Sequence, residues 1–85
     1  MRISTYPTEF RNNINVEIVS DVEEHCIISL TNQKGMIRVL MGVHLRAGVN
    51  NILVDNIGAL EVGAYHLHVK NTESKTLYDA QLIKQ

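Results

Sequence analysis

Apolar side chains recur at every second position along most of this chain, and that spacing is typical of β-strands. In one stretch, Ile14, Val16 and Ile18 alternate with Asn15 and Glu17. No window of helical length shows the apolar spacing of an amphipathic helix, so residues 56–62 are expected to form one short helical turn at most. We predict about seven strands, with approximate limits at residues 3–6, 14–20, 25–32, 36–42, 49–55, 63–71 and 75–84.

Polar and glycine-containing segments separate the predicted strands. Residues 32–35 have the composition of a hairpin loop, with Gly35 at a position that favours positive φ. Gly42 and then Gly48 are expected to bracket the next connection, and residues 71–74 form a polar turn. Because each strand has one apolar and one polar face, we predict two antiparallel sheets packed face to face, as in an immunoglobulin-like β-sandwich.

The composition limits the classes of protein that this chain can belong to. Its 85 residues suggest one domain, and 45% hydrophobic with 20% charged residues is typical of a globular protein. The formal net charge of −1 gives no basic footprint for nucleic acid. The sequence shows no apolar stretch long enough for a membrane-spanning helix and no signal-peptide pattern. A single cysteine excludes an internal disulfide and a multi-cysteine zinc site.

Few residues are arranged for chemistry, and we predict neither an enzyme nor a bound cofactor or small-molecule substrate. His66 and His68 lie two positions apart, so on a strand they share a face and are weak candidates for metal ligands. A solvent-facing surface is the simpler interpretation. Cys26 follows His25, but neighbouring residues on a strand face opposite ways, so we expect Cys26 to be a buried apolar residue.

Glycine, tyrosine and proline mark both ends of the predicted sandwich. Gly63 lets the chain turn into its strand, and Tyr65 is expected to bury its ring while its hydroxyl reaches backbone at the end of the sandwich. Near the start of the chain, Tyr6 and Pro7 precede Phe10, and the proline predicts an edge or an entry bend. These residues are expected, at the least, to specify the fold.

Short motifs follow one another in a fixed order over nearly the whole chain. They are Tyr-Pro-x-x-Phe at residues 6–10, an amphipathic strand at 14–18, a strand with a turn ending in glycine at 28–35, a strand at 36–41, Leu-x-Ala-Gly at 45–48, a strand at 51–55, Leu-x-x-Gly-x-Tyr at 60–65 and a lysine-containing strand at 75–85. In order and spacing they resemble the C-terminal sorting domain of the type IX secretion system of Bacteroidetes.

The resemblance implies a passenger domain without catalytic activity, placed at the C-terminus of a longer exported precursor. Its partners would be the outer-membrane translocon and a sortase-like peptidase, and its route would run from the periplasm to the cell surface or the medium. The residues that carry the recognition or fold motifs are Tyr6, Pro7, Phe10, Gly35, Gly48, Gly63, Tyr65, Lys84 and Gln85. We expect the exposed recognition elements to be the last strand, with Lys84 and Gln85, and the loops that carry Gly48 and Gly63.

Two departures from the family pattern keep a second hypothesis open. Thr8 and Glu9 stand where the family has Asn and Pro, and Glu61 and Val62 stand where it has Pro-x before the glycine. The alternative is an immunoglobulin-like structural or adhesive module of a secreted Bacteroidetes protein. In either case a long unpaired edge strand in so small a sandwich allows the chain to pair with a copy of itself.

Overall fold

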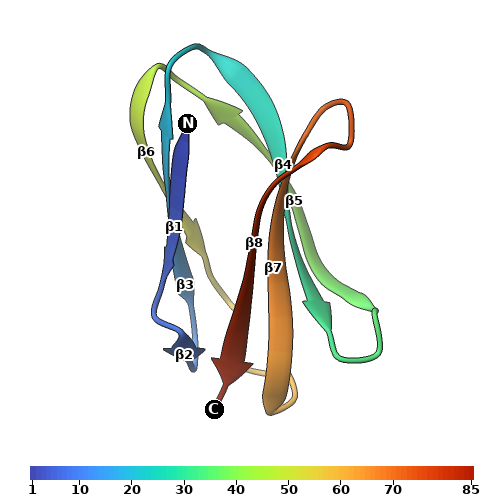
Figure 1. Ribbon diagram of the computed structural model, residues 1–85. Helices are drawn as coiled ribbons and strands as arrows, with labels where there is room; N and C mark the ends of the chain where they lie inside the picture. The colour runs from blue at the N-terminus through green and yellow to red at the C-terminus, as the bar shows by residue number, and fades with distance from the viewer.

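The computed structural model describes residues 1–85 and consists of strands and connecting turns. The strands are β1 (Arg2–Tyr6), β2 (Glu9–Phe10), β3 (Ile14–Ser20), β4 (Glu24–Asn32), β5 (Ile37–Leu45), β6 (Gly48–Val54), β7 (Gly63–Asn71) and β8 (Thr76–Lys84). They form a three-stranded sheet in the order β1-β3-β6 and a five-stranded sheet in the order β2-β8-β7-β4-β5. Figure 1 shows the two sheets side by side as the layers of a sandwich, which confirms the predicted all-β, immunoglobulin-like class.

The core follows directly from the two-residue alternation. On β3, the side chains of Ile14, Val16 and Ile18 are buried and point at the five-stranded sheet. The facing strands β4 and β7 alternate in the same way and contribute most of the remaining core. The fourteen buried apolar residues are Phe10, Ile14, Val16, Ile18, Cys26, Ile28, Leu30, Leu45, Val54, Ile57, Tyr65, Leu67, Val69 and Leu82. Burying each large side chain contributes roughly 1.5–3 kcal/mol to folding.

β2 was not predicted, and its pairing is parallel rather than antiparallel. Glu9 lies opposite Ile83 and Phe10 opposite Lys84, so β2 runs alongside β8 at the edge of the five-stranded sheet. The chain leaves the three-stranded sheet after Tyr6, whose peptide bond to Pro7 is cis, and joins the other sheet at Glu9. A strand of two residues is too short to show an alternating pattern in the sequence.

β5 is longer than predicted, because Gly42 does not end it. The strand continues to Leu45, with Gly42 opposite Ile27 and His44 opposite His25 on β4. Gly42 has no positive φ, whereas Gly48 has a φ of 106° just after the tight turn that links β5 to β6. The prediction of a connection starting at Gly42 was therefore wrong, since the glycine there occupies ordinary strand backbone.

The segment between β6 and β7 contains turns and no helix. Ile57 is buried in it, 3% exposed, and anchors the segment to the core. Asn56 has a φ of 60°, and a Cβ at Gly58 would lie 2.7 Å from the side-chain oxygen of Asn12. The buried Ile57 side chain and the close approach of Gly58 to Asn12 together fix the path of this segment at the end of the sandwich. The structure has no helix of the length and apolarity needed to cross a membrane.

Candidate recognition surface

The predicted motif residues gather at one end of the molecule. In Figure 1 the C-terminus, β2, the start of β7 and the β4–β5 hairpin all lie at the lower end. The sheet register agrees, because Gly63 of β7 and Phe10 of β2 both lie opposite Lys84 of β8. Gly48 is the exception, since it begins β6 opposite Ser20 at the other end of the sandwich. The topology therefore collects residues from the start, middle and end of the chain.

Phe10 and Tyr65 form the buried part of this end. Their exposed fractions are 1% and 2%, and their rings meet edge to face with centroids 5.9 Å apart. The hydroxyl of Tyr65 donates a hydrogen bond of 2.6 Å to the backbone carbonyl of Glu61. This confirms the expectation of a buried ring with a hydroxyl that reaches backbone. Both side chains hold the loop before β7 and strand β2 in place, and neither is accessible to a partner.

Lys84 is buried, and the expectation of an exposed Lys84 was wrong. Its exposed fraction is 5%, and its Nζ donates a hydrogen bond of 2.7 Å to the backbone carbonyl of Gln85. β8 has neighbours on both sides, β7 and β2, and Lys84 shares the inward parity of Leu82. Gln85 is exposed, as expected. Its backbone N–H donates to the carbonyl of Phe10 at 2.9 Å, and its side-chain amide donates to the carboxylate of Glu9.

The exposed part of this end is a shallow hollow between the β4–β5 hairpin and the segment before β7. Lys34 and Arg38 line it from the hairpin, and Glu61 and Val62 line it from the segment that leads to Gly63. Val62 is 77% exposed, so apolar and charged surfaces lie next to each other. Such a surface can make both ionic and apolar contacts. Sequence reasoning missed the hollow, because its two walls are far apart in the chain.

Asparagine side chains build three of the tight loops of the sandwich. The side-chain oxygen of Asn32 accepts backbone hydrogen bonds from Lys34 at 3.0 Å and from Met36 at 2.9 Å. The side chain of Asn71 accepts in the same way from Glu73 at 3.0 Å and Lys75 at 2.9 Å. Such bonds from an Asx side chain to nearby backbone are a known turn signal. The β4–β5 and β7–β8 loops therefore share the same pattern of side-chain to backbone hydrogen bonds, and they lie at opposite ends of the molecule.

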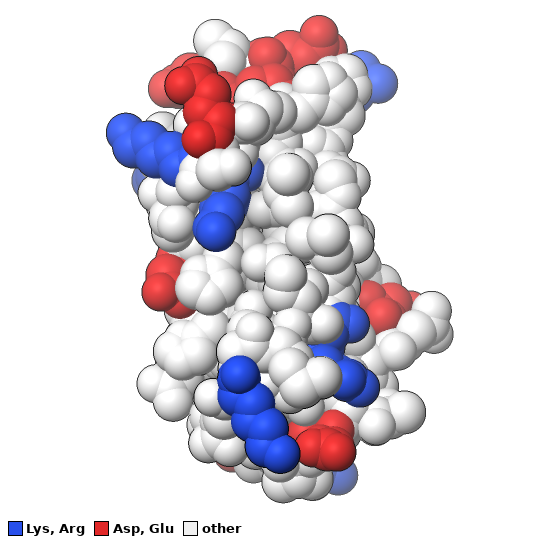
Figure 2. Space-filling view, turned by 90° about the vertical axis from the view of Figure 1, so that its right-hand side faces the viewer, with Lys and Arg blue, Asp and Glu red and all other residues white.

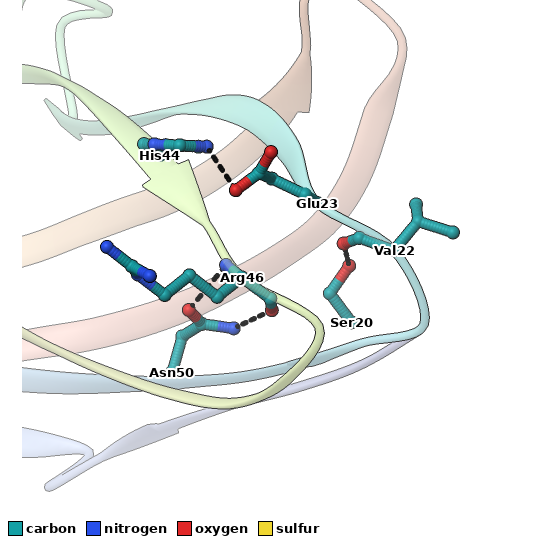
Figure 3. A network of polar contacts seen from close by, with 6 residues as sticks. All are labelled: Ser20, Val22, Glu23, His44, Arg46 and Asn50. Atoms are coloured by element: carbon teal, nitrogen blue, oxygen red, sulfur yellow. Dashed lines mark hydrogen bonds and ion pairs between the residues drawn. The ribbon is translucent and has the colours of Figure 1, made fainter.

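Asn50 plays the corresponding role at the end that carries Gly48. Its side-chain oxygen accepts from the Arg46 backbone at 2.9 Å, and its amide donates to the carbonyls of Arg46 at 2.9 Å and Gly48 at 3.2 Å, as drawn in part in Figure 3. The amide also reaches the carbonyl of Ile18 at 3.1 Å on the neighbouring strand. Gly48 therefore belongs to a rigid turn at the end opposite the other motif residues.

All four histidines lie outside the core, in two pairs. His66 and His68 share one face of β7 as predicted, with ring centroids 6.1 Å apart, and each has its Nδ1 atom 3.7 Å from a carboxylate oxygen of Asp79. His25 and His44 stack across β4 and β5 with ring centroids 4.6 Å apart. No group of three or more His, Cys, Asp or Glu side chains is arranged to hold a metal ion.

Cys26 is a core residue, as predicted. It is 1% exposed, and burial together with the nearby Glu24 carboxylate raises the pKa of its thiol. A raised pKa disfavours the thiolate, which is the nucleophilic form of cysteine. His25 points to the opposite face of β4, where it stacks on His44. The pair Cys26 and His25 therefore has neither the geometry nor the protonation state of a nucleophile and its base.

Comparisons with known proteins show the fold alone. No family model matches the chain, and no curated protein does. Solved structures of a β-glucosidase from Listeria innocua are similar to it. A mutant bound to laminaribiose has a TM-score of 0.63 at 14% identity over 99% of this chain, and the complex with isofagomine has a TM-score of 0.64 at 14% identity over 98%. The complex with glucose has a TM-score of 0.56 at 12% identity. This chain spans only 16% of the length of each.

Proposed function

We propose that this chain is a non-catalytic sorting domain that directs an attached cargo through a type IX translocon to the cell surface. The observation that carries the proposal is the ordered set of motifs from Tyr6 to Gln85, which covers nearly the whole sequence. All the motif residues except Gly48 gather at one end of the sandwich, which adds support, because a partner that reads a folded signal needs its recognition residues on one surface.

At the end of the sandwich where these motif residues gather, the buried and the exposed residues have different roles. Phe10, Tyr65 and Lys84 are buried and fix the shape of the surface. Tyr6, which is 49% exposed, Gln85 and the hollow beside Lys34 are accessible to a translocon component. Recognition then depends on a rigid surface and not on a reacting group. The sortase-like peptidase would act on the junction with the cargo after transport.

The direct test is export of a reporter. Residues 1–85 are fused to the C-terminus of a fluorescent protein that carries a signal peptide, and the fusion is expressed in a type IX-competent bacterium. We expect fluorescence at the cell surface or in the medium, and periplasmic fluorescence in a strain without the translocon. Periplasmic retention of a folded fusion in both strains would contradict the proposal.

A matched pair of substitutions tests which end is recognised. Lys34 and Lys75 are both exposed, and both lie in turns held by an asparagine side chain, but at opposite ends of the sandwich. Surface substitutions of this kind change stability by only about 0.5 kcal/mol or less. We expect Lys34→Glu to reduce export of the reporter and Lys75→Glu to leave it unchanged. Equal export of the two variants would exclude the hollow as the recognised surface.

The alternative is an immunoglobulin-like structural or adhesive module within a larger protein. Its support is the fold, which recurs as 16% of the length of a much larger β-glucosidase chain. Fold alone does not determine function, since similar sandwiches serve many roles. The reporter experiment separates the two proposals, because a spacer or adhesive module gives no translocon-dependent change in the location of the fusion.

A further inference from the structure

The two sheets have four edge strands of unequal length. β2 has two residues, β1 five, β6 seven and β5 nine. β5 pairs only with β4, so the N–H and C=O groups along its other side have no strand partner. Native proteins usually protect such an edge with proline, an inward-pointing charge or a short strand. β5 has no proline and no inward-pointing charge; what protection it has lies at its start, in the exposed Arg38 and the register shift of its pairing with β4 between Leu30 and Thr31.

The edge is apolar on its inward face, and its outer face carries one large apolar side chain, Leu40, among Arg38, Gly42 and His44. Val39, Met41 and Val43 pack against the margin of the core and are only partly buried. On the outer face Leu40 is 65% exposed, and at the start of the strand Ile37 is 60% exposed. Figure 2, seen from the side of the five-stranded sheet, shows an uncharged strip down the middle of this face, with charged residues at both ends and along both margins. A strand added at β5 would place cross-strand side chains beside these residues and reduce their contact with water.

Charges at the two ends of β5 are complementary to each other. Arg38, near its start, is exposed and forms no ion pair within the chain. At its other end, the carboxylate of Glu23 lies 3.3 Å from Nε2 of His44, as Figure 3 shows. In an antiparallel pair of two β5 strands centred near Met41, Arg38 of each copy lies opposite His44 of the other and near the Glu23 carboxylate that contacts that histidine. A parallel pair would instead place Arg38 beside Arg38, which is unfavourable.

We propose that two copies of this chain pair antiparallel through β5, about a two-fold axis near the middle of the strand, and so join two five-stranded sheets into one. The occupant that fits this edge is a second copy, because the apolar centre and the opposite charges at the ends are self-complementary. A single pair of strand edges buries less than the roughly 1,600 Å² of a standard interface, so the dimer is weak and depends on concentration. This inference does not depend on the sorting function.

Sedimentation velocity of the 85-residue chain over a wide concentration range tests the proposal. We expect a reversible monomer–dimer equilibrium. Leu40→Lys places a charge on the outer face of β5 in both copies, and we expect it to weaken the dimer by about tenfold or more. Val49→Lys is the matched control, since Val49 is 64% exposed on the other long edge strand, β6. Circular dichroism checks that both variants fold.

A charge exchange tests the antiparallel arrangement independently of Leu40. Arg38→Glu should weaken the dimer, because it places two carboxylates together at each end of the paired strands. Adding Glu23→Arg should restore the affinity of the original chain. The proposal is overturned by a chain that stays monomeric at every concentration, by equal weakening in Val49→Lys and Leu40→Lys, or by a double variant no tighter than Arg38→Glu alone.

Discussion

Cys26 shows how position on a strand determines the chemistry of one side chain. It lies on the inward face of β4, which it shares with Ile28 and Leu30, and 1% of its surface is exposed. Desolvation is the larger cause of its raised pKa, and the carboxylate of Glu24 is the smaller. Both effects oppose the thiolate, so the folded chain keeps the thiol protonated at a pH at which the unfolded chain begins to lose the proton.

This difference predicts a pH dependence of stability. In the unfolded chain the thiol ionises near pH 8.5, and in the folded chain only at higher pH, so above about pH 8.5 the free energy of unfolding falls with pH. Cys26→Ala should lower stability at pH 7 by about 1 kcal/mol through lost packing and remove the part of the alkaline decrease that is due to the thiol. Urea unfolding at pH 7 and pH 9.5 measures both; identical alkaline slopes in the two proteins would contradict the assignment.

A thiol reagent gives a second, independent readout for Cys26. We expect negligible labelling of the folded chain at pH 8 and complete labelling in denaturant, because the thiol is buried and protonated in the fold. Rapid labelling without denaturant would show that β4 opens readily at this position. The labelling rate also reports how often the core near Cys26 is exposed to solvent.

The burial of a residue could be predicted where the strand face assigned by the alternation agrees with the polarity of the side chain. Cys26 and Tyr65 both follow the apolar alternation, and both are buried as expected. Lys84 was predicted wrongly because its exposure was taken from the resemblance and not from its parity on the strand. It lies two residues after the buried Leu82, so the pattern itself placed it inward. Its aliphatic stem fits the apolar surroundings while Nζ reaches the carbonyl of Gln85.

At the level of elements, strands of five or more residues could be located from the sequence, and the two-residue β2 could not. The parallel pairing of β2 with β8 joins segments separated by most of the chain, and no local pattern encodes it. The end of β5 was misplaced because a glycine is a turn signal only where the backbone needs positive φ. Gly48 meets that condition and Gly42 does not.

The two glycines make a matched prediction. Gly48→Ala forces a Cβ onto a backbone with a φ of 106°, which costs about 1–3 kcal/mol even though nothing lies within 4 Å of that Cβ. Gly42→Ala adds a Cβ in open space on ordinary strand backbone, and we expect it to be neutral or to stabilise by about 0.5–1 kcal/mol. Urea midpoints of the two variants measure the difference. Equal destabilisation would mean that β5 is distorted at Gly42.

On the scale of the whole molecule, β8 brings a segment near the N-terminus and the C-terminal residues together in one sheet. It pairs with β7 on one side and with β2 on the other, so residues 9–10 depend on residues 83–84 for their place in the sheet. Alternation predicted the layers of the sandwich but not this neighbour order, because a two-residue period says which face a side chain takes and not which strand lies beside it. The hollow between the β4–β5 hairpin and the segment before β7 was missed for the same reason.

Removal of the last five residues is therefore expected to damage the fold as well as any signal. The deletion takes away the buried Leu82 and Lys84 and the strand edge against which Phe10 is held. Loss of a large core side chain alone costs about 2–5 kcal/mol, a large part of the stability of a small domain. We expect the shortened chain to lose its cooperative thermal transition in circular dichroism. Lys84→Met keeps the inward volume and should retain it. If the shortened chain instead melts cooperatively at the original temperature, the end of β8 is not required for the fold. In that case, a reporter fusion that stays in the periplasm would identify the last five residues themselves as the signal.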